Sequence, residues 1–363
     1  MSIFDKDKDL FETYKLGDLE LKNRIVMAPM TRNRAIDNIP NDLMAKYYGQ
    51  RADSAGLIIT EGTSPSINGI GYPRIPGAYS PAQINGWKEV VKTVHDKGGK
   101  IFLQLMHCGR IAAMENVPDG GEVLAPSAVK AAGEMYTDDK GNVEHVEPRA
   151  MTKEDIEKAQ NEYVNAAELA IERAGFDGVE LHSANGYLME QFLNPKSNVR
   201  QDEYGGDFKN RARFVLETAK KVADRIGGKK LGIRLSPYGA FNDMQHNYDD
   251  LVELYSYLAS ELRELGLVYI HIVDHTAMGT PEFKSDIKKT IKLNFGKTVI
   301  SGGGVDSTDD AKAILDKGLD LVYVGRAFIS NPDLVNKLKH NKELKEPNQD
   351  LFYTPGPEGY TDY

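Results

Sequence analysis

Short apolar runs rich in β-branched residues alternate with longer segments of helical periodicity along nearly the whole chain. Continuous apolar runs of this length are typical of strands that are covered on both faces of a parallel sheet. We expect eight such strands, at residues 24–30, 56–62, 101–107, 178–184, 231–237, 268–274, 298–304 and 321–326. Eight strands, each followed by a helix, favour an α/β fold in which a closed (β/α)8 TIM barrel forms a single domain over residues 1–363. An open doubly wound sheet is the structural alternative.

Two of the expected helices begin with specific signals. Ser80 followed by Pro81 is a capping residue with proline in the first turn. Thr152 is followed three residues later by Asp155, an acidic variant of the capping box. Apolar positions repeat at helical spacing after each start, and Gly175 ends the second helix. These signals support the alternation of strand and helix.

Two segments depart from the alternation. Residues 109–150 form a long excursion after the third strand, in which the arms 135–137 and 143–146 flank a polar turn and predict a hairpin. The active site of a β/α barrel lies at the carboxyl ends of its strands, so we expect this insertion to act as a lid. A second hairpin, at residues 14–22, is expected to plug the opposite end of the barrel.

Charge and hydropathy limit the partners. The chain has 45 Lys and Arg residues against 54 Asp and Glu residues, a formal charge of −9, which repels phosphate backbones and argues against a nucleic acid partner. No apolar run approaches the roughly 20 residues of a membrane span. Residues 1–9 are charged and carry no apolar signal core. We therefore expect a cytoplasmic protein without a membrane partner.

Cys108 is the only cysteine. A single cysteine excludes an internal disulfide, a Cys-rich zinc site and an iron–sulfur cluster. Histidine-based metal sites are also disfavoured, because a His-x-His pair on an early strand is absent and His271 and His275 are four apart around one strand end. We expect no metal in the site.

Glycine-rich turns follow the last two strands. Ser301 and Gly302 lead into Gly303 and Gly304, and Gly325 stands at the end of the eighth strand. Such turns expose backbone N–H groups, and this is where β/α barrels bind phosphate. The alternative is that these glycines only form tight corners. No G-x-G-x-x-G sequence follows a strand, so the phosphate is not expected to belong to a Rossmann-bound nucleotide.

Arg234 and Gln104 lie inside apolar strands, where a charge or an amide is costly unless it is paired. They are either paired within the core or directed at a planar polar ligand at the barrel mouth. An amide supplies a donor and an acceptor, and a guanidinium stabilises an anion. Both properties suit the ligand interpretation.

His182, Asn185 and Tyr187 follow each other where the fourth strand becomes a loop. A turn of helical type would place His182 and Asn185 on the same side. Two donors there could hold one carbonyl oxygen, and the phenol could donate a proton. The alternative is a structural histidine.

In combination, the motifs of the chain resemble the Old Yellow Enzyme family of FMN-dependent ene-reductases, especially its bacterial members that act on pentaerythritol tetranitrate and N-ethylmaleimide. The likeness runs from about Leu10 to the C-terminus, and the block at residues 182–188 is its most specific part. The matching segments are residues 23–32, 47–52, 175–188, 191–193, 204–206, 210–213 and 358–363. The resemblance implies an NAD(P)H-dependent enzyme that reduces the C=C bond of α,β-unsaturated carbonyl compounds, with nitro compounds or nitrate esters as further candidates.

The resemblance also implies a bound FMN, reduced by NADPH or NADH as the co-substrate. Thr31 would hydrogen-bond the flavin O4 beside the Gly62 backbone, Gln104 would bind the pyrimidine edge, and Arg234 would lie at N1 and O2. Four positions would hold the phosphate: Gly303, Gly304, Gly325 and Arg326. Pro29 and Met30, next to Thr31 in the same motif, complete the expected cofactor contacts.

For the substrate, the resemblance implies that His182 and Asn185 polarise a carbonyl group. Tyr187 would protonate the α-carbon after hydride from flavin N5 reaches the β-carbon, and Tyr72 and Tyr353 would line the pocket. Met106 stands where the family has a bulky tryptophan or phenylalanine, so it should widen or soften one side of the pocket. We expect activated alkenes as substrates and a monomer or homodimer.

Two rival functions stay open at this point. One is a phosphate-binding barrel isomerase or a metal-dependent hydrolase that uses the same strand ends. The other is a flavin-storing or redox-partner protein without an alkene substrate of its own.

Overall fold

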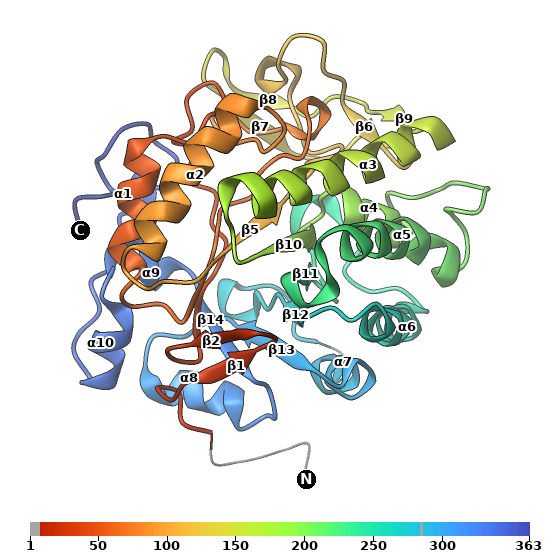
Figure 1. Cartoon of the computed structure of the whole chain (residues 1–363). Helices are drawn as coiled ribbons and strands as arrows, with labels where there is room; N and C mark the ends of the chain where they lie inside the picture. Colours follow the sequence, from red (N-terminus) through yellow and green to blue (C-terminus); the bar gives the residue numbers. More distant parts are fainter. Residues whose placement is uncertain (1–7, 284–285) are drawn as a thin grey trace.

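The computed structural model describes residues 8–283 and 286–363, and its eight parallel strands close into a barrel. Of the charged segment at the N-terminus, residues 1–7 lie outside the described residues. Because β5 pairs with β10 and β14 pairs with β3, the sheet has no open edge (Figure 1). The strands of the barrel are β3 (Ile25–Met27), β4 (Leu57–Ile59), β5 (Ile101–Leu105), β10 (Gly178–Ser183), β11 (Leu231–Leu235), β12 (Tyr269–Ile272), β13 (Thr298–Gly302) and β14 (Leu321–Val324). The expected TIM barrel is confirmed, and the open sheet is excluded.

Helices cover the outside of the barrel (Figure 1). The signals at Ser80 and Thr152 form complete capping boxes, with Gln83 and Asp155 as the reciprocal partners. The larger helices are α1 (Asp42–Arg51), α2 (Pro81–His95), α3 (Lys153–Leu169), α5 (Phe208–Ile226), α6 (Leu251–Glu264), α7 (Ile287–Phe295) and α8 (Thr308–Leu315). Three shorter helices are α4 (Leu188–Leu193), α9 (Arg326–Ser330) and α10 (Leu334–Lys339). The eighth strand ends at Val324, so Arg326 begins a helix instead of ending the strand.

The N-terminal hairpin consists of β1 (Tyr14–Leu16) and β2 (Leu19–Leu21). Its Leu16 and Leu21 are fully buried in one cluster with side chains from the barrel strands, among them Leu57 and Ile300. The Tyr14 hydroxyl is 2.7 Å from the Thr298 Oγ1, at the first residue of β13. The hairpin therefore plugs the amino-terminal end of the barrel, as expected.

The excursion at residues 109–150 carries four short strands: β6 (Leu124–Ala125), β7 (Glu134–Thr137), β8 (Gly141–Glu144) and β9 (Arg149–Ala150). The hairpin β7–β8 matches the expected arms, although each arm is shifted by one or two residues. Figure 1 places it at the opposite end of the molecule from β1–β2. It lies beside the cavity described below, which suits the expected lid.

The C-terminal segment crosses the same end of the barrel and is held through its backbone. Arg32 donates to the carbonyl oxygens of Phe352 and Gly359 at 3.0 and 2.7 Å. Arg34 donates to the Phe352 carbonyl oxygen at 2.6 Å. The Tyr360 ring stacks on Tyr47, with 4.0 Å between the ring centroids. These contacts fix the segment that carries Tyr353.

Among the described helices, none combines the length and the apolar character that a membrane crossing requires.

Candidate active site

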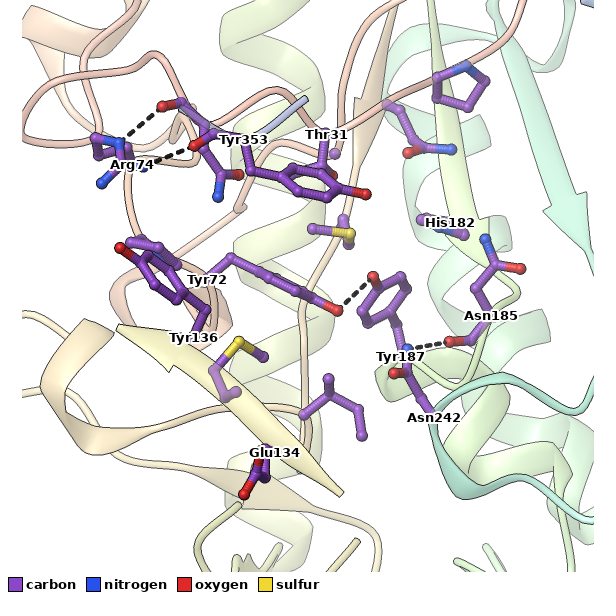
Figure 2. Close-up of a pocket in the computed structure, with 18 of the residues that line it drawn as sticks. Thr31, Tyr72, Arg74, Glu134, Tyr136, His182, Asn185, Tyr187, Asn242 and Tyr353 are labelled. Atoms are coloured by element: carbon purple, nitrogen blue, oxygen red, sulfur yellow. Dashed lines mark hydrogen bonds between the residues drawn. The ribbon is translucent and has the colours of Figure 1, made fainter. Parts of the chain in front are cut away.

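A cavity of about 640 Å³ opens at the carboxyl ends of the barrel strands (Figure 2). Its wall brings together residues from strand ends, from the lid hairpin and from the C-terminal segment, far apart in the sequence. Eleven expected site residues line it: Pro29, Thr31, Gly62, Tyr72, Gln104, Met106, His182, Asn185, Tyr187, Arg234 and Tyr353. The expected substrate and flavin-ring positions therefore share one space.

The catalytic candidates lie on the turn that leaves β10. His182 is the fifth residue of that strand, and Tyr187 caps the short helix α4. The turn between them is left-handed, with φ of 57° at Asn185 and 75° at Gly186, so the expected turn of helical type is wrong. A side chain at Gly186 would come within 2.9 Å of the Phe241 carbonyl oxygen, which accounts for the glycine. All three candidate side chains nevertheless line the cavity.

A left-handed turn at a non-glycine residue needs support from its surroundings. The Asn185 N–H donates to the Ser236 Oγ at 2.9 Å, and the Asn185 carbonyl oxygen accepts from the Asn242 Nδ2 at 2.6 Å (Figure 2). The Gly186 N–H donates to the Glu190 Oε2 at 2.5 Å, and its carbonyl oxygen accepts from the Gln191 Nε2 at 2.7 Å. Side chains thus satisfy all four backbone groups of the two residues.

His182 is buried and neutral. Burial lowers the pKa of His182 well below 6.5, and the nearby charge of Arg234 lowers it further, with His271 and His275 as smaller causes. Its Nδ1 is buried without a hydrogen-bond partner among the described residues. A neutral imidazole with a free ring nitrogen can donate one hydrogen bond into the cavity without carrying a charge.

Tyr187 keeps its phenolic proton. Burial, with Tyr72 and Cys108 as further causes, raises the pKa of Tyr187 well above 10. The Tyr187 and Tyr72 hydroxyl oxygens are 3.0 Å apart, and the His182 and Tyr187 ring centroids are 5.0 Å apart (Figure 2). The phenol can therefore act as a proton donor beside the histidine.

A buried carboxylate lies under the cavity. Glu180 accepts hydrogen bonds from the Gln104 Nε2 at 2.8 Å and from the Tyr269 hydroxyl at 2.9 Å. The Nδ1 of His271 lies 2.9 Å from it. Burial acts to raise the pKa of Glu180, but its contact with His271, the charge of Arg234 and the hydrogen bond from Gln104 keep that pKa below its ordinary value. This carboxylate orients the Gln104 amide and balances the buried guanidinium.

Arg234 provides the test of whether a flavin fits. Its side chain is buried at the cavity wall, yet its Nε has no hydrogen-bond partner among the residues described. A buried guanidinium nitrogen without an acceptor is costly, and an acceptor atom of a bound ligand would remove that cost. At Gly62 an added Cβ would meet the Met106 sulfur at 2.5 Å, so the backbone is free of a side chain on this wall. The residues present fit the expected FMN ring.

The other five expected cofactor positions lie outside this cavity, at neighbouring strand ends. They are Met30, Gly303, Gly304, Gly325 and Arg326. Gly303 has a φ of 106°, and an added Cβ would meet the Asp274 carbonyl oxygen at 2.5 Å. An added Cβ at Gly325 would make only ordinary van der Waals contacts, with the Met30 sulfur at 3.7 Å. Burial is the main cause that lowers the pKa of His275 to about 4, and the charges of Arg234 and Arg326 add to it. The two arginines therefore act on one region beside the glycine turns.

Several side chains that shape the site were missing from the sequence analysis. Glu180, Glu190, Ser236 and Asn242 had no signal beyond their closeness to strand ends. Arg74 has a φ of 52° and donates to the carbonyl oxygens of Asn33 and Tyr353, which joins two segments of the cavity rim (Figure 2). No group of three or more His, Cys, Asp or Glu side chains in the described ranges is arranged to hold a metal ion.

The chain is similar to known proteins along nearly its whole length. The model of a family described as the NADH:flavin oxidoreductase / NADH oxidase family matches residues 9–345. The chain is 40% identical over 359 residues to a putative 12-oxophytodienoate reductase 4 of Oryza sativa subsp. japonica, covering 98% of this chain and 92% of that one. It is 37% identical over 388 residues to the flavin oxidoreductase hxnT of Emericella nidulans, covering 98% and 97%.

Solved structures agree with the sequence relatives. Morphinone reductase superposes with a TM-score of 0.93 at 41% identity, covering 99% of this chain and 96% of that chain. An old yellow enzyme homologue from Zymomonas mobilis superposes with a TM-score of 0.92 at 36% identity, covering 98% and 99%.

We expect His182 to stay neutral through the range around pH 6.5 in which an ordinary histidine titrates, because burial lowers its pKa well below that value. The test is an NMR titration of protein labelled at the histidine ring nitrogens, with the His182 signal assigned from the His182→Gln variant. A histidine in a short unstructured peptide, with an ordinary pKa of about 6.5, serves as the reference. A His182 signal with a midpoint near 6.5 would contradict the neutral assignment.

Proposed function

Since the chain belongs to the NADH:flavin oxidoreductase / NADH oxidase family, which includes the Old Yellow Enzymes, we propose that it reduces the C=C bond of α,β-unsaturated carbonyl compounds at the expense of NAD(P)H. The resemblance noted in the sequence is confirmed at the level of the family. The chain is an FMN-dependent ene-reductase that uses a nicotinamide co-substrate.

The observation that carries the proposal is the meeting of two kinds of group in one cavity. Gln104 and Arg234 lie on the wall assigned to the flavin, and the Arg234 Nε has no hydrogen-bond partner among the described residues. Neutral His182, Asn185 and protonated Tyr187 line the same space. A planar redox ring and a small carbonyl compound would then have separate sets of partners.

A bound flavin would supply the hydride-transfer chemistry that links the nicotinamide to the β-carbon of the alkene. Arg234 would stabilise negative charge at the N1 and O2 edge of the reduced ring, and Thr31 would hydrogen-bond O4. His182 and Asn185 would donate to the substrate carbonyl oxygen and stabilise the charge that develops there. Tyr187 would deliver the proton to the α-carbon.

Further features belong to the same proposal. Pro29, Met30 and Gly62 would contact the ring, and the four candidates at residues 303, 304, 325 and 326 would hold the phosphate. Tyr72, Met106 and Tyr353 would shape the substrate pocket. We propose a cytoplasmic, single-domain protein, monomeric or homodimeric, that acts on activated alkenes and binds no nucleic acid. Nitro compounds and nitrate esters are further proposed acceptors, which would depend less on Tyr187.

The purified protein is expected to be yellow, to bleach with NADPH or NADH under anaerobic conditions, and to regain its colour with 2-cyclohexenone. The absorbance of the flavin measures each step, and a panel of alkenes with both nicotinamides defines the preference. A colourless protein that takes up no FMN would refute the flavin assignment. A protein that bleaches but is not reoxidised by any alkene would favour a redox-partner role.

His182→Ala removes one of the two donors to the carbonyl oxygen. Loss of an oxyanion donor typically costs about a hundredfold or more in rate, so we expect alkene reduction to slow by about that factor while FMN stays bound. Stopped-flow reoxidation by 2-cyclohexenone and the flavin content of the purified variant measure the two effects. Unchanged turnover would remove His182 from the mechanism.

Tyr187→Phe removes the proposed proton donor and keeps the ring that packs near His182. We expect flavin reduction by NADPH to be unchanged and reoxidation by 2-cyclohexenone to slow by about a hundredfold, the lower range for general acid catalysis. The two half-reactions are measured separately in an anaerobic stopped-flow instrument. If both keep their rates, water or another group supplies the proton.

A further inference from the structure

Glu190 is a buried acid close to the proposed catalytic groups and does not line the cavity. It is the third residue of α4, only 3% exposed, and both of its carboxylate oxygens face the turn that leaves β10. Oε2 accepts from the Gly186 N–H at 2.5 Å. Oε1 accepts from the Ser236 Oγ at 2.7 Å, and Ser236 in turn accepts from the Asn185 N–H at 2.9 Å.

One carboxylate thus holds two consecutive backbone N–H groups, one directly and one through a serine hydroxyl. These N–H groups belong to the two residues with left-handed backbone, Asn185 and Gly186. Asparagine enters the left-handed region more readily than other non-glycine residues, and these partners fix it there. Asn185 and Tyr187 flank Gly186. The hydrogen bonds that fix the backbone of this turn therefore also determine where both side chains enter the cavity. We propose that Glu190, acting through Ser236 and the Gly186 N–H, is a positioning residue for the alkene-reducing groups Asn185 and Tyr187.

An ordinary helix cap does not account for these contacts. In a capping box, the acidic residue at the third helical position accepts from the N–H of the capping residue, which here is Tyr187. The Tyr187 N–H instead donates to the Ala184 carbonyl oxygen at 3.3 Å, and Glu190 reaches one residue further back. The second oxygen binds a residue that follows another strand, β11, which capping of α4 does not require.

Both contacts need acceptor oxygens, so the ionised form of Glu190 makes the full set. Burial raises the pKa of Glu190 to about 7. The titratable groups that act on it from the α6 side are the phenols of Tyr248 and Tyr255, both buried and with raised pKa values. Arg211 lies beyond Tyr248 and is paired with Asp250. Around pH 7 the two phenols are neutral and Arg211 is paired with Asp250. Among these groups, Glu190 is therefore the one whose charge changes near that pH.

The inference rests on the proposed function, because it assigns Glu190 to groups whose roles are proposed. We expect Glu190→Ala to slow flavin reoxidation by 2-cyclohexenone by about tenfold or more, since small misplacements of reacting groups carry large rate costs. Reoxidation by ferricyanide, which requires no hydrogen bond to a carbonyl, and the FMN content should stay unchanged. Glu162→Ala, which removes a partly buried acid from α3 outside the site, is the matched control.

Two further variants separate positioning from general damage. Ser236→Ala removes only the link to the Asn185 N–H and should slow cyclohexenone reduction in the same direction, even if Glu190→Ala fails to fold. Combined with Asn185→Ala, Glu190→Ala should add much less than the factor it produces alone, because both act through one turn. Because ionised Glu190 makes both contacts, we expect the cyclohexenone rate of the unmodified protein to rise with pH around 7. In Glu190→Gln, this rise should be lost.

Results opposite to these expectations would overturn the inference alone or the inference together with the proposed function. Normal cyclohexenone reduction in Glu190→Ala and Ser236→Ala, next to a slow Asn185→Ala, would overturn the inference and leave the proposed function intact. Equal slowing with ferricyanide, or effects of Glu190→Ala and Asn185→Ala that multiply, would also overturn it. If Asn185→Ala and Tyr187→Phe both reduce cyclohexenone normally, the proposed function fails first and the inference fails with it.

Discussion

The mouth of this barrel depends on the burial of opposite charges along its axis. Arg234 and Glu180 are both withdrawn from water, at a cost that can reach several kcal/mol per ion when a charge is left unpaired. Glu180 offsets its share through contacts with Gln104, Tyr269 and His271. The Arg234 Nε at the cavity wall has no hydrogen-bond partner among the described residues, and an acceptor on a bound ring would offset part of this cost. Binding of an acceptor-rich ring is favoured because it completes the arrangement.

Burial and the charge of Arg234 together set the protonation states around the cavity. The buried guanidinium contributes to holding His182, His271 and His275 in their neutral forms, although burial is the main cause for each. A neutral donor beside a protonated phenol suits a site that must stabilise a developing negative charge and then supply a proton. The same interior electrostatics therefore serve both the flavin side and the substrate side of the cavity.

Much of this arrangement was predictable, because the apolar runs that form the barrel strands are local in the sequence. The positions of Gln104, Arg234 and His182 at strand ends followed from those runs. Glu180 was missed since its partners Tyr269 and His271 lie 89 and 91 residues away, and only barrel closure brings them together. The left-handed turn at Asn185 and Gly186 was missed although Asn-Gly is a local signal for such a turn. The contacts that hold it come from Ser236 and Asn242, which are distant in the sequence.

The grip on the C-terminal segment has a consequence for how the pocket can diverge. Arg32 and Arg34 hold that segment mainly through carbonyl oxygens, which every amino acid has. The Thr354 hydroxyl also accepts from Arg34 at 3.2 Å, whereas Tyr353 and Pro355 face the cavity beside these carbonyl contacts. Substitutions at Tyr353 and Pro355 can alter the shape of the entrance while the segment keeps its path. Insertions or deletions would shift the register of the carbonyl groups and detach it. New substrate preferences would therefore arise from substitutions in this segment and not from changes in its length.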